Sequence, residues 1–138
     1  MNPKLQCILL VDDDKATNFL NNRLLTKMEV AQNIFIAKNG VEAENYLQKA
    51  LHNQPGFPRP ELILLDINMP FINGWEFLDR YENLPASFKQ NIRILMLTTS
   101  LREADIERAR ITPSVKGLIF KPLNEDEIRW VIQQNFYL

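Results

Sequence analysis

The sequence has little cysteine, no excess of charge of either sign and no long apolar run. Cys7 is the only cysteine among 138 residues, so an internal disulfide cannot form. This excludes a disulfide scaffold, and one thiol within an apolar stretch is typical of a reducing compartment. The formal net charge is −1, from 16 Lys and Arg against 17 Asp and Glu. This balance, without a long basic run, argues against a nucleic-acid-binding protein.

The apolar runs are also too short for a membrane span, which needs roughly 20 apolar residues. The N-terminal apolar run ends in three aspartates, unlike a signal peptide. We therefore expect a cytoplasmic protein. With 46% apolar and 24% charged residues, the composition is that of a folded protein, and residues 1–138 suffice for a single domain.

Four short apolar runs and one weaker run predict a parallel sheet that is buried on both faces. The strong runs cover residues 8–11, 62–65, 94–97 and 118–120, and the weaker run covers residues 34–37. Between and after them, apolar side chains recur at helical spacing, and Asn124 with the acids after it suits the start of the last helix. Five strands that alternate with five helices predict a doubly wound α/β fold with right-handed crossovers.

The stretch 52–60 contains three prolines and a glycine, which predicts a surface connection before the third strand. The only histidine, His52, stands at its beginning. We expect it to be solvated or to cap a helix rather than to carry a phosphoryl group.

Polar residues follow four of the five runs, at the point where each run ends. They are Asp12, Asp13 and Asp14, then Asp66, then Thr98, Thr99 and Ser100, and finally Lys121. In an open parallel sheet, ligands bind outside the carboxyl ends of the strands. We therefore expect carboxylates, hydroxyls and one ammonium group to meet at one edge of the sheet.

This set of groups is suited to phosphoryl chemistry. Asp12, Asp13 and Asp66 would repel one another and raise each other's pKa. A hard divalent cation such as Mg²⁺ relieves this repulsion, and one carboxylate could then attack a phosphorus centre while Lys121 neutralises phosphoryl oxygens. A hydroxyl at Thr98 could hydrogen-bond the new group and report its presence. The pattern indicates an aspartyl-phosphate switch.

Four motifs, each at the end of a predicted strand, carry a resemblance to a known family. They are ILLVDDD at residues 8–14, LILLDINMP at 62–70 with Gly74 beyond it, LMLTTS at 95–100 and FKP at 120–122. Over nearly its whole length the sequence resembles the receiver domains of bacterial response regulators in two-component signalling. The resemblance implies a flavodoxin-like (βα)5 fold with a five-stranded parallel sheet of order 2-1-3-4-5.

The resemblance also implies the metal site. Asp13 would bind Mg²⁺ directly, Asp12 would act partly through water, Asp66 would be a ligand, and Asn68 would offer its backbone carbonyl. No other cofactor is expected.

For the phosphoryl group, the resemblance implies Asp66 as the acceptor, Thr98 as the switch hydroxyl and Lys121 as its ion-pair partner. A cis peptide bond between Lys121 and Pro122 is expected. The chain would be a stand-alone receiver without an output domain, a switch rather than an enzyme. A sensor histidine kinase or phosphotransfer protein would phosphorylate it, and a conformational change would reach an unidentified output partner or a second copy of the chain. The LTTS motif and the proline-rich connection are similar to single-domain regulators that serve phytochrome-type kinases.

The sequence departs from the family pattern at several positions. Leu118 replaces the aromatic residue that often turns inward on activation, so the usual aromatic switch is in doubt. Thr99 is bulkier than the residue that commonly follows the switch hydroxyl. Pro113 should end the fourth long helix early, which makes the face formed by the fourth and fifth helices unusual.

Three other functions compete with this interpretation. A phosphohydrolase of the haloacid dehalogenase type needs an acid two residues after its nucleophile, and Asn68 stands there instead. A flavin-binding protein of this fold would place a phosphate beside three aspartates, which would repel it. A pseudo-receiver that only binds proteins is the remaining alternative, although all five site residues are retained.

Overall fold

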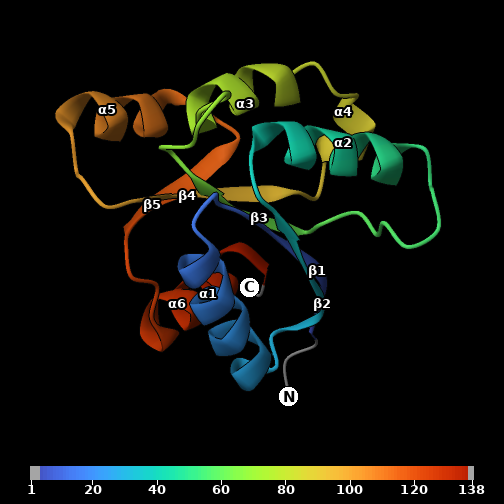
Figure 1. The fold of residues 1–138 in the computed structure, drawn as a ribbon, viewed down its shortest axis with the longest axis horizontal. Helices are drawn as coiled ribbons and strands as arrows, with labels where there is room; N and C mark the ends of the chain where they lie inside the picture. The colour runs from blue at the N-terminus through green and yellow to red at the C-terminus, as the bar shows by residue number, and fades with distance from the viewer. Residues whose placement is uncertain (1–3, 137–138) are drawn as a thin grey trace.

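The computed structural model describes residues 4–136 and contains one five-stranded parallel sheet. The strand order is β2-β1-β3-β4-β5, as predicted (Figure 1). The strands are β1 (Leu5–Val11), β2 (Ala31–Ala37), β3 (Leu62–Asp66), β4 (Arg93–Thr98) and β5 (Val115–Phe120). β1 pairs with both β2 and β3, so the order reverses beside β1 and the switch point lies at its carboxyl end.

Helices cover both faces of this sheet. They are α1 (Lys15–Met28), α2 (Gly40–Leu51), α3 (Gly74–Tyr81), α4 (Ala86–Lys89), α5 (Glu103–Ile111) and α6 (Glu125–Phe136). α1 and α6 lie on one face, whereas α2, α3 and α5 lie on the other (Figure 1). The five long helices match the prediction, and the single turn of α4 was not predicted. No helix in the described part of the chain is long and apolar enough to span a bilayer.

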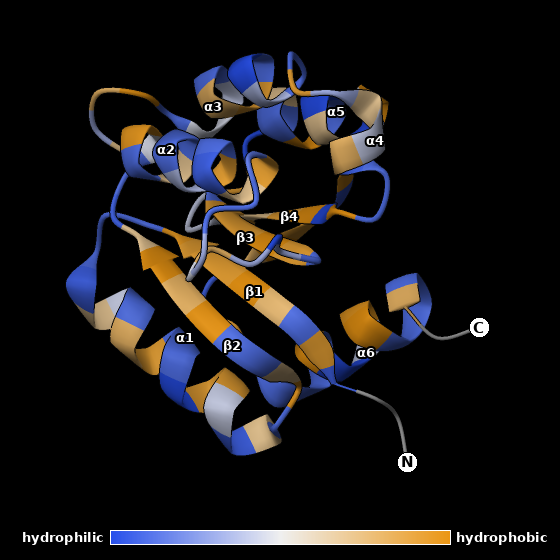
Figure 2. Ribbon diagram, turned by 90° about the vertical axis from the view of Figure 1, so that its right-hand side faces the viewer, coloured by the Kyte–Doolittle hydropathy of each residue, from blue (hydrophilic) through white to orange (hydrophobic). Residues whose placement is uncertain are grey.

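The strands divide the core into two layers by simple alternation. In β1, Cys7, Leu9 and Val11 face the layer under α2, α3 and α5, whereas Ile8 and Leu10 face α1 and α6. All five side chains are buried, because a central strand of a doubly wound sheet is covered on both sides. Figure 2 shows the same result as hydrophobic colour concentrated in the strands.

Side-chain caps start most of the long helices immediately after the strand ends. The side chain of Asp14 accepts a hydrogen bond from the Thr17 amide, and Asn39 caps α2 in the same way. Asn124 accepts from the Glu127 amide at 2.9 Å, which confirms its predicted role. These caps fix where the three helices begin beyond the carboxyl ends of the strands.

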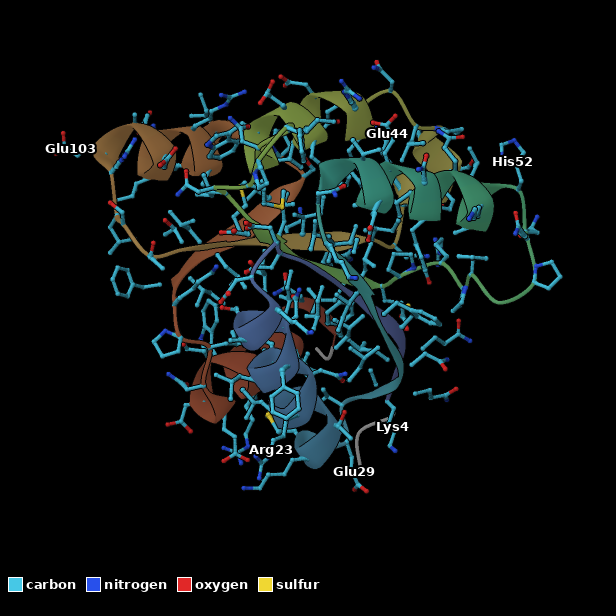
Figure 3. The ribbon with its side chains drawn as sticks, in the orientation of Figure 1. Lys4, Arg23, Glu29, Glu44, His52 and Glu103 are labelled. Carbon is cyan, nitrogen blue, oxygen red and sulfur yellow. The ribbon has the colours of Figure 1, made fainter. Side chains whose placement is uncertain are left out.

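The proline-rich connection packs against α2. The Tyr46 hydroxyl donates to the Pro58 carbonyl oxygen at 2.6 Å, and the Tyr46 ring contacts Phe57 edge-on. His52 caps the end of α2, and its Nδ1 lies 2.8 Å from the Gln48 carbonyl oxygen. Its place beside this connection, away from the start of α1 (Figure 3), agrees with the capping role expected for it.

Candidate functional site

The three predicted carboxylates meet at the carboxyl end of the sheet. Asp12 and Asp13 directly follow β1, and Asp66 is the last residue of β3. The register pairs Val11 with Leu65, which brings Asp12 beside Asp66. One carboxylate oxygen from each of the three aspartates lies within 4.8 Å of the others. Asp12 and Asp66 are buried, whereas Asp13 is exposed and borders solvent.

Lys121 completes the cluster from the end of β5. Its Nζ lies 2.7 Å from Oδ2 of Asp12 and 3.2 Å from Oδ1 of Asp66. Its backbone N–H donates to the Thr98 carbonyl oxygen at 2.8 Å, which ties the residue to the end of β4. The peptide bond between Lys121 and Pro122 is cis, as expected.

Thr98 ends β4 next to this cluster, but its hydroxyl is engaged elsewhere. The hydroxyl donates to the Ser100 carbonyl oxygen at 2.8 Å and accepts from the Ser100 amide at 3.0 Å. Among residues 4–136 both of its hydrogen bonds are with Ser100, so this hydroxyl is not hydrogen-bonded to Asp66 or Lys121.

The loop after Asp66 explains why a glycine stands at the start of α3. The Gly74 amide donates to the Ile67 carbonyl oxygen at 2.8 Å. A Cβ at Gly74 would lie 2.7 Å from the carbonyl oxygen of Asp66, closer than real contacts allow. The helix can therefore approach the candidate acceptor only because this residue has no side chain. Asn68 follows in the same loop, and its backbone amide lowers the pKa of Asp66, against the larger effect of burial.

The family of the chain follows from comparison with known proteins. Residues 8–133 match the response regulator receiver domain family. This chain is a receiver domain of that family. The two-component response regulator from Cytophaga hutchinsonii has the same fold, with a TM-score of 0.88, 29% sequence identity, and coverage of 99% of this chain and 100% of that chain.

Two further relatives bear on the site of this receiver domain. The bacteriophytochrome response regulator AtBRR matches with a TM-score of 0.78 and 30% identity, covering 99% of this chain and 96% of that chain. Response regulator Rcp1 from Synechocystis is 36% identical over 104 residues, which are 72% of this chain and 65% of Rcp1. The structure of Rcp1 in its Mn(2+)-bound form matches with a TM-score of 0.69 and 31% identity, covering 94% of this chain and 90% of that chain.

The site of the receiver domain holds more negative than positive charge. Burial, followed by the neighbouring Asp12, raises the pKa of Asp66 to about 6, and the Lys121 ammonium offsets this only in part. For Lys121, burial alone would lower the pKa, but the hydrogen bond to Asp12 and the charge of Asp66 outweigh burial and raise it. Burial and the charge of Asp12 thus favour protonated Asp66, whereas the two carboxylates favour the charged form of Lys121. An additional cation would therefore favour ionised Asp66.

Sequence reasoning missed Asn18, a buried residue of α1 that supports the acid cluster. Its Nδ2 donates to the backbone carbonyl oxygen of Asp12 at 2.8 Å. The Asp14 amide donates to the Asp12 carboxylate at 2.9 Å, so Asp12 is held from two sides. The apolar pattern of α1 could not have indicated it, because Asn18 and Asn21 are buried whereas Phe19 and Leu20 are exposed.

Proposed function

We propose that this receiver domain is a signalling switch that accepts a phosphoryl group on Asp66, with Mg²⁺ in the acid cluster. The observation that carries the proposal is the convergence of three carboxylates within 4.8 Å, with the Lys121 ammonium 3.2 Å from Asp66. The donor is a sensor histidine kinase or a phosphotransfer protein. An Asp66 carboxylate oxygen attacks phosphorus, the bond between phosphorus and the donor histidine nitrogen breaks, and that nitrogen keeps the electron pair.

The donor set fits a hard divalent cation. Three ionised carboxylates and one ammonium group leave two uncompensated negative charges, and Mg²⁺ prefers carboxylate and carbonyl oxygens with water. Asp13 and Asp66 would hold the ion directly, Asp12 partly through water, and Asn68 through its backbone carbonyl. The ion would supply charge neutralisation at the phosphoryl oxygens. The Mn(2+)-bound form of Rcp1 supports a divalent metal at this kind of site.

Lys121 and Thr98 would recognise the phosphoryl group once it is attached. Lys121 already lies within hydrogen-bonding distance of Asp66 and needs only a small shift to pair with phosphoryl oxygens. Thr98 would exchange its hydrogen bond to the Ser100 carbonyl oxygen for one to the phosphoryl group. The fold therefore offers a charge-dependent change at the end of β4.

The same geometry supports a switch over the alternatives. Asn68 stands where a phosphohydrolase would need an acid, so we propose no catalytic turnover of a separate substrate. A pseudo-receiver would have no need of a buried aspartate whose pKa is raised to about 6 beside a lysine. Similarity to AtBRR supports a phytochrome-type kinase as the donor. A stand-alone, single-domain organisation in the cytoplasm remains our prediction.

The output surface we propose is formed by α5, β5 and α6. It exposes four large apolar side chains, which are Ile106, Ile111, Phe120 and Trp130. Exposed apolar side chains on these elements would suit docking of an output protein or of a second copy of the chain.

The test is labelling with acetyl phosphate and Mg²⁺, followed by intact mass. We expect the wild-type chain to gain one phosphoryl group and Asp66→Asn to gain none. The matched control is Asp126→Asn, which makes the same change at an exposed residue of α6 and should label like the wild type. Undiminished labelling of Asp66→Asn would contradict the assigned acceptor, and no labelling of the wild type despite metal binding would favour the pseudo-receiver.

A further inference from the structure

A hydrogen bond between Trp75 and Asp105 joins α3 to α5. Trp75 is the second residue of α3 and is only 7% exposed, and its indole N–H donates to Oδ1 of Asp105 at 2.9 Å. The Arg108 guanidinium lies 4.7 Å from the centre of the indole ring and 3.7 Å from Oδ1 of Asp79. The charged groups along this seam are thus Asp79 on α3, with Asp105 and Arg108 on α5.

The helix α5 buries little apolar surface of its own. Of its nine residues only Ala109 is buried, and Ile106 and Ile111 are exposed. Arg102 precedes the helix and makes no capping hydrogen bond within the described part of the chain. Figure 3 shows the start of α5, marked by Glu103, at the outer edge of the molecule. Helices with little buried apolar surface have low local stability, so the bond to Trp75 contributes to positioning α5.

The α3 side of the seam is fixed to the candidate acceptor. Gly74 precedes Trp75, and the space for a side chain at Gly74 is filled by the backbone of Asp66. The hydrogen bond from Gly74 to Ile67 holds the same contact. If α5 shifts relative to Asp66, α3 stays in place, and the bond between Trp75 and Asp105 is strained or broken by the movement of α5.

The loop between β4 and α5 links that side to the phosphoryl site. The Thr98 hydroxyl has one proton, and it is donated to the Ser100 carbonyl oxygen. A phosphoryl group on Asp66 would compete for this proton and release the carbonyl of Ser100. The exposed residues 99–102 lead directly into α5, so a shift of this loop displaces the first turn, which contains Asp105.

We infer that Trp75 and Asp105 are positioning residues whose hydrogen bond holds α5 in the unphosphorylated arrangement and so opposes phosphorylation of Asp66. The inference rests on the proposed function. This hydrogen bond would also couple phosphorylation of Asp66 to the position of α5 in a chain whose Leu118 cannot act as an aromatic switch. Leu118 is partly buried and packs against the core layer that contains Trp75.

The direction of the effect follows from linkage. A bond made only in the resting arrangement lowers the population of the switched arrangement, and its removal must tighten the binding of any ligand that prefers the switched one. A single hydrogen bond of ordinary net strength corresponds to a change of about 2- to 10-fold. A merely structural bond would lower stability without tightening binding.

The first test measures the affinity for beryllofluoride, a phosphoryl mimic, in the presence of Mg²⁺. Trp75→Phe keeps a smaller aromatic ring and loses the N–H donor, and Asp105→Ala loses the acceptor. We expect each to bind the mimic about 2- to 10-fold more tightly than the wild type, and the double variant to gain no more than one single variant. The matched control is Glu107→Ala, which removes the same charge from α5 but breaks only an exposed pair with Arg110. It should bind like the wild type.

The outcomes separate this inference from the proposed function. Unchanged or weaker binding by Trp75→Phe, in a protein that acetyl phosphate still labels on Asp66, would overturn the positioning role alone. Loss of labelling in the wild type would overturn both. If Asp105→Ala does not fold, Trp75→Phe decides the question, because it keeps an aromatic side chain at this position.

A second readout follows Trp75 itself. Trp130 is 59% exposed, and Trp130→Phe leaves Trp75 as the sole indole. We expect beryllofluoride with Mg²⁺ to increase the quenching of Trp75 fluorescence by acrylamide, because the indole loses its cover from α5. No change in quenching at saturating mimic would overturn the inference, and Asp66→Asn serves as the unresponsive control.

Discussion

α3 and α5 both flank the candidate phosphoryl site, but they are attached to the sheet in opposite ways. α3 buries five of its eight residues and begins with a capping box formed by Asn73 and Glu76. α5 buries one of nine residues and begins without a side-chain cap among the residues described. A receiver needs both kinds of helix, because a signal is transmitted only if one neighbour of the site stays fixed while another can move.

The largest difference between the two helices should appear in stability. Phe77 of α3 is 1% exposed, and Ile106 of α5 is 43% exposed. We expect Phe77→Ala to lower the free energy of unfolding by about 3–5 kcal/mol, because it leaves a cavity, and Ile106→Ala by less than about 1 kcal/mol. Urea denaturation of the two variants measures this. Equal losses would mean that α5 is as firmly packed as α3.

The second effect concerns the ionisation of Asp66, which lies against the firmly held helix α3. The pKa of Asp66 in the folded chain, about 6, lies above the value of about 3.9 for an unfolded aspartate. The native state therefore binds the proton more tightly, and ionisation of Asp66 lowers stability as the pH rises from about 4 to about 6. Without a divalent metal, Asp66→Asn should be more stable than the wild type at pH 7.5, by about 3 kcal/mol.

Denaturation curves at several pH values check this expectation. The advantage of Asp66→Asn should shrink towards pH 4, where the wild-type carboxyl group is protonated, and Mg²⁺ should reduce it at pH 7.5. A wild type that is the more stable protein at pH 7.5 without metal would contradict the raised pKa.

The smallest effect concerns the starts of the two helices. Asn73→Ala removes the cap of α3 and should cost about 1 kcal/mol, whereas Arg102→Asp should stabilise α5 by about 0.5–1 kcal/mol. Arg102 already has the extended backbone that a cap requires, with φ −80° and ψ 138°. Hydrogen exchange of the α5 amides measures the gain, and unchanged protection would show that capping does not limit the stability of α5.

The sequence was sufficient for the sheet and for the placement of the site because both depend on local patterns. Each strand is a short apolar run, and each candidate residue directly follows one, so parallel strands necessarily bring Asp12, Asp66 and Lys121 to one edge. Pro113 likewise predicted the end of α5, which terminates at Ile111. The assigned roles of these residues in metal and phosphoryl binding remain predictions.

What the sequence did not predict depends on contacts between distant residues. Trp75 and Asp105 are 30 positions apart, and neither belongs to a motif. The Thr98 hydroxyl could have faced Asp66 or its own loop, and only the backbone geometry decides between them. α4 is a single turn without a side-chain cap, so neither periodicity nor capping indicated it.

The buried Cys7 has a practical consequence for work on this chain. It lies in β1 between two neighbouring strands, is fully covered, and has its thiol pKa raised by burial. A thiol reagent can therefore reach it only when the centre of the sheet opens. The rate at which Cys7 is alkylated would therefore measure how often the sheet opens. A bound ligand that stabilises the folded state would lower this rate, and no engineered residue would be needed to detect it.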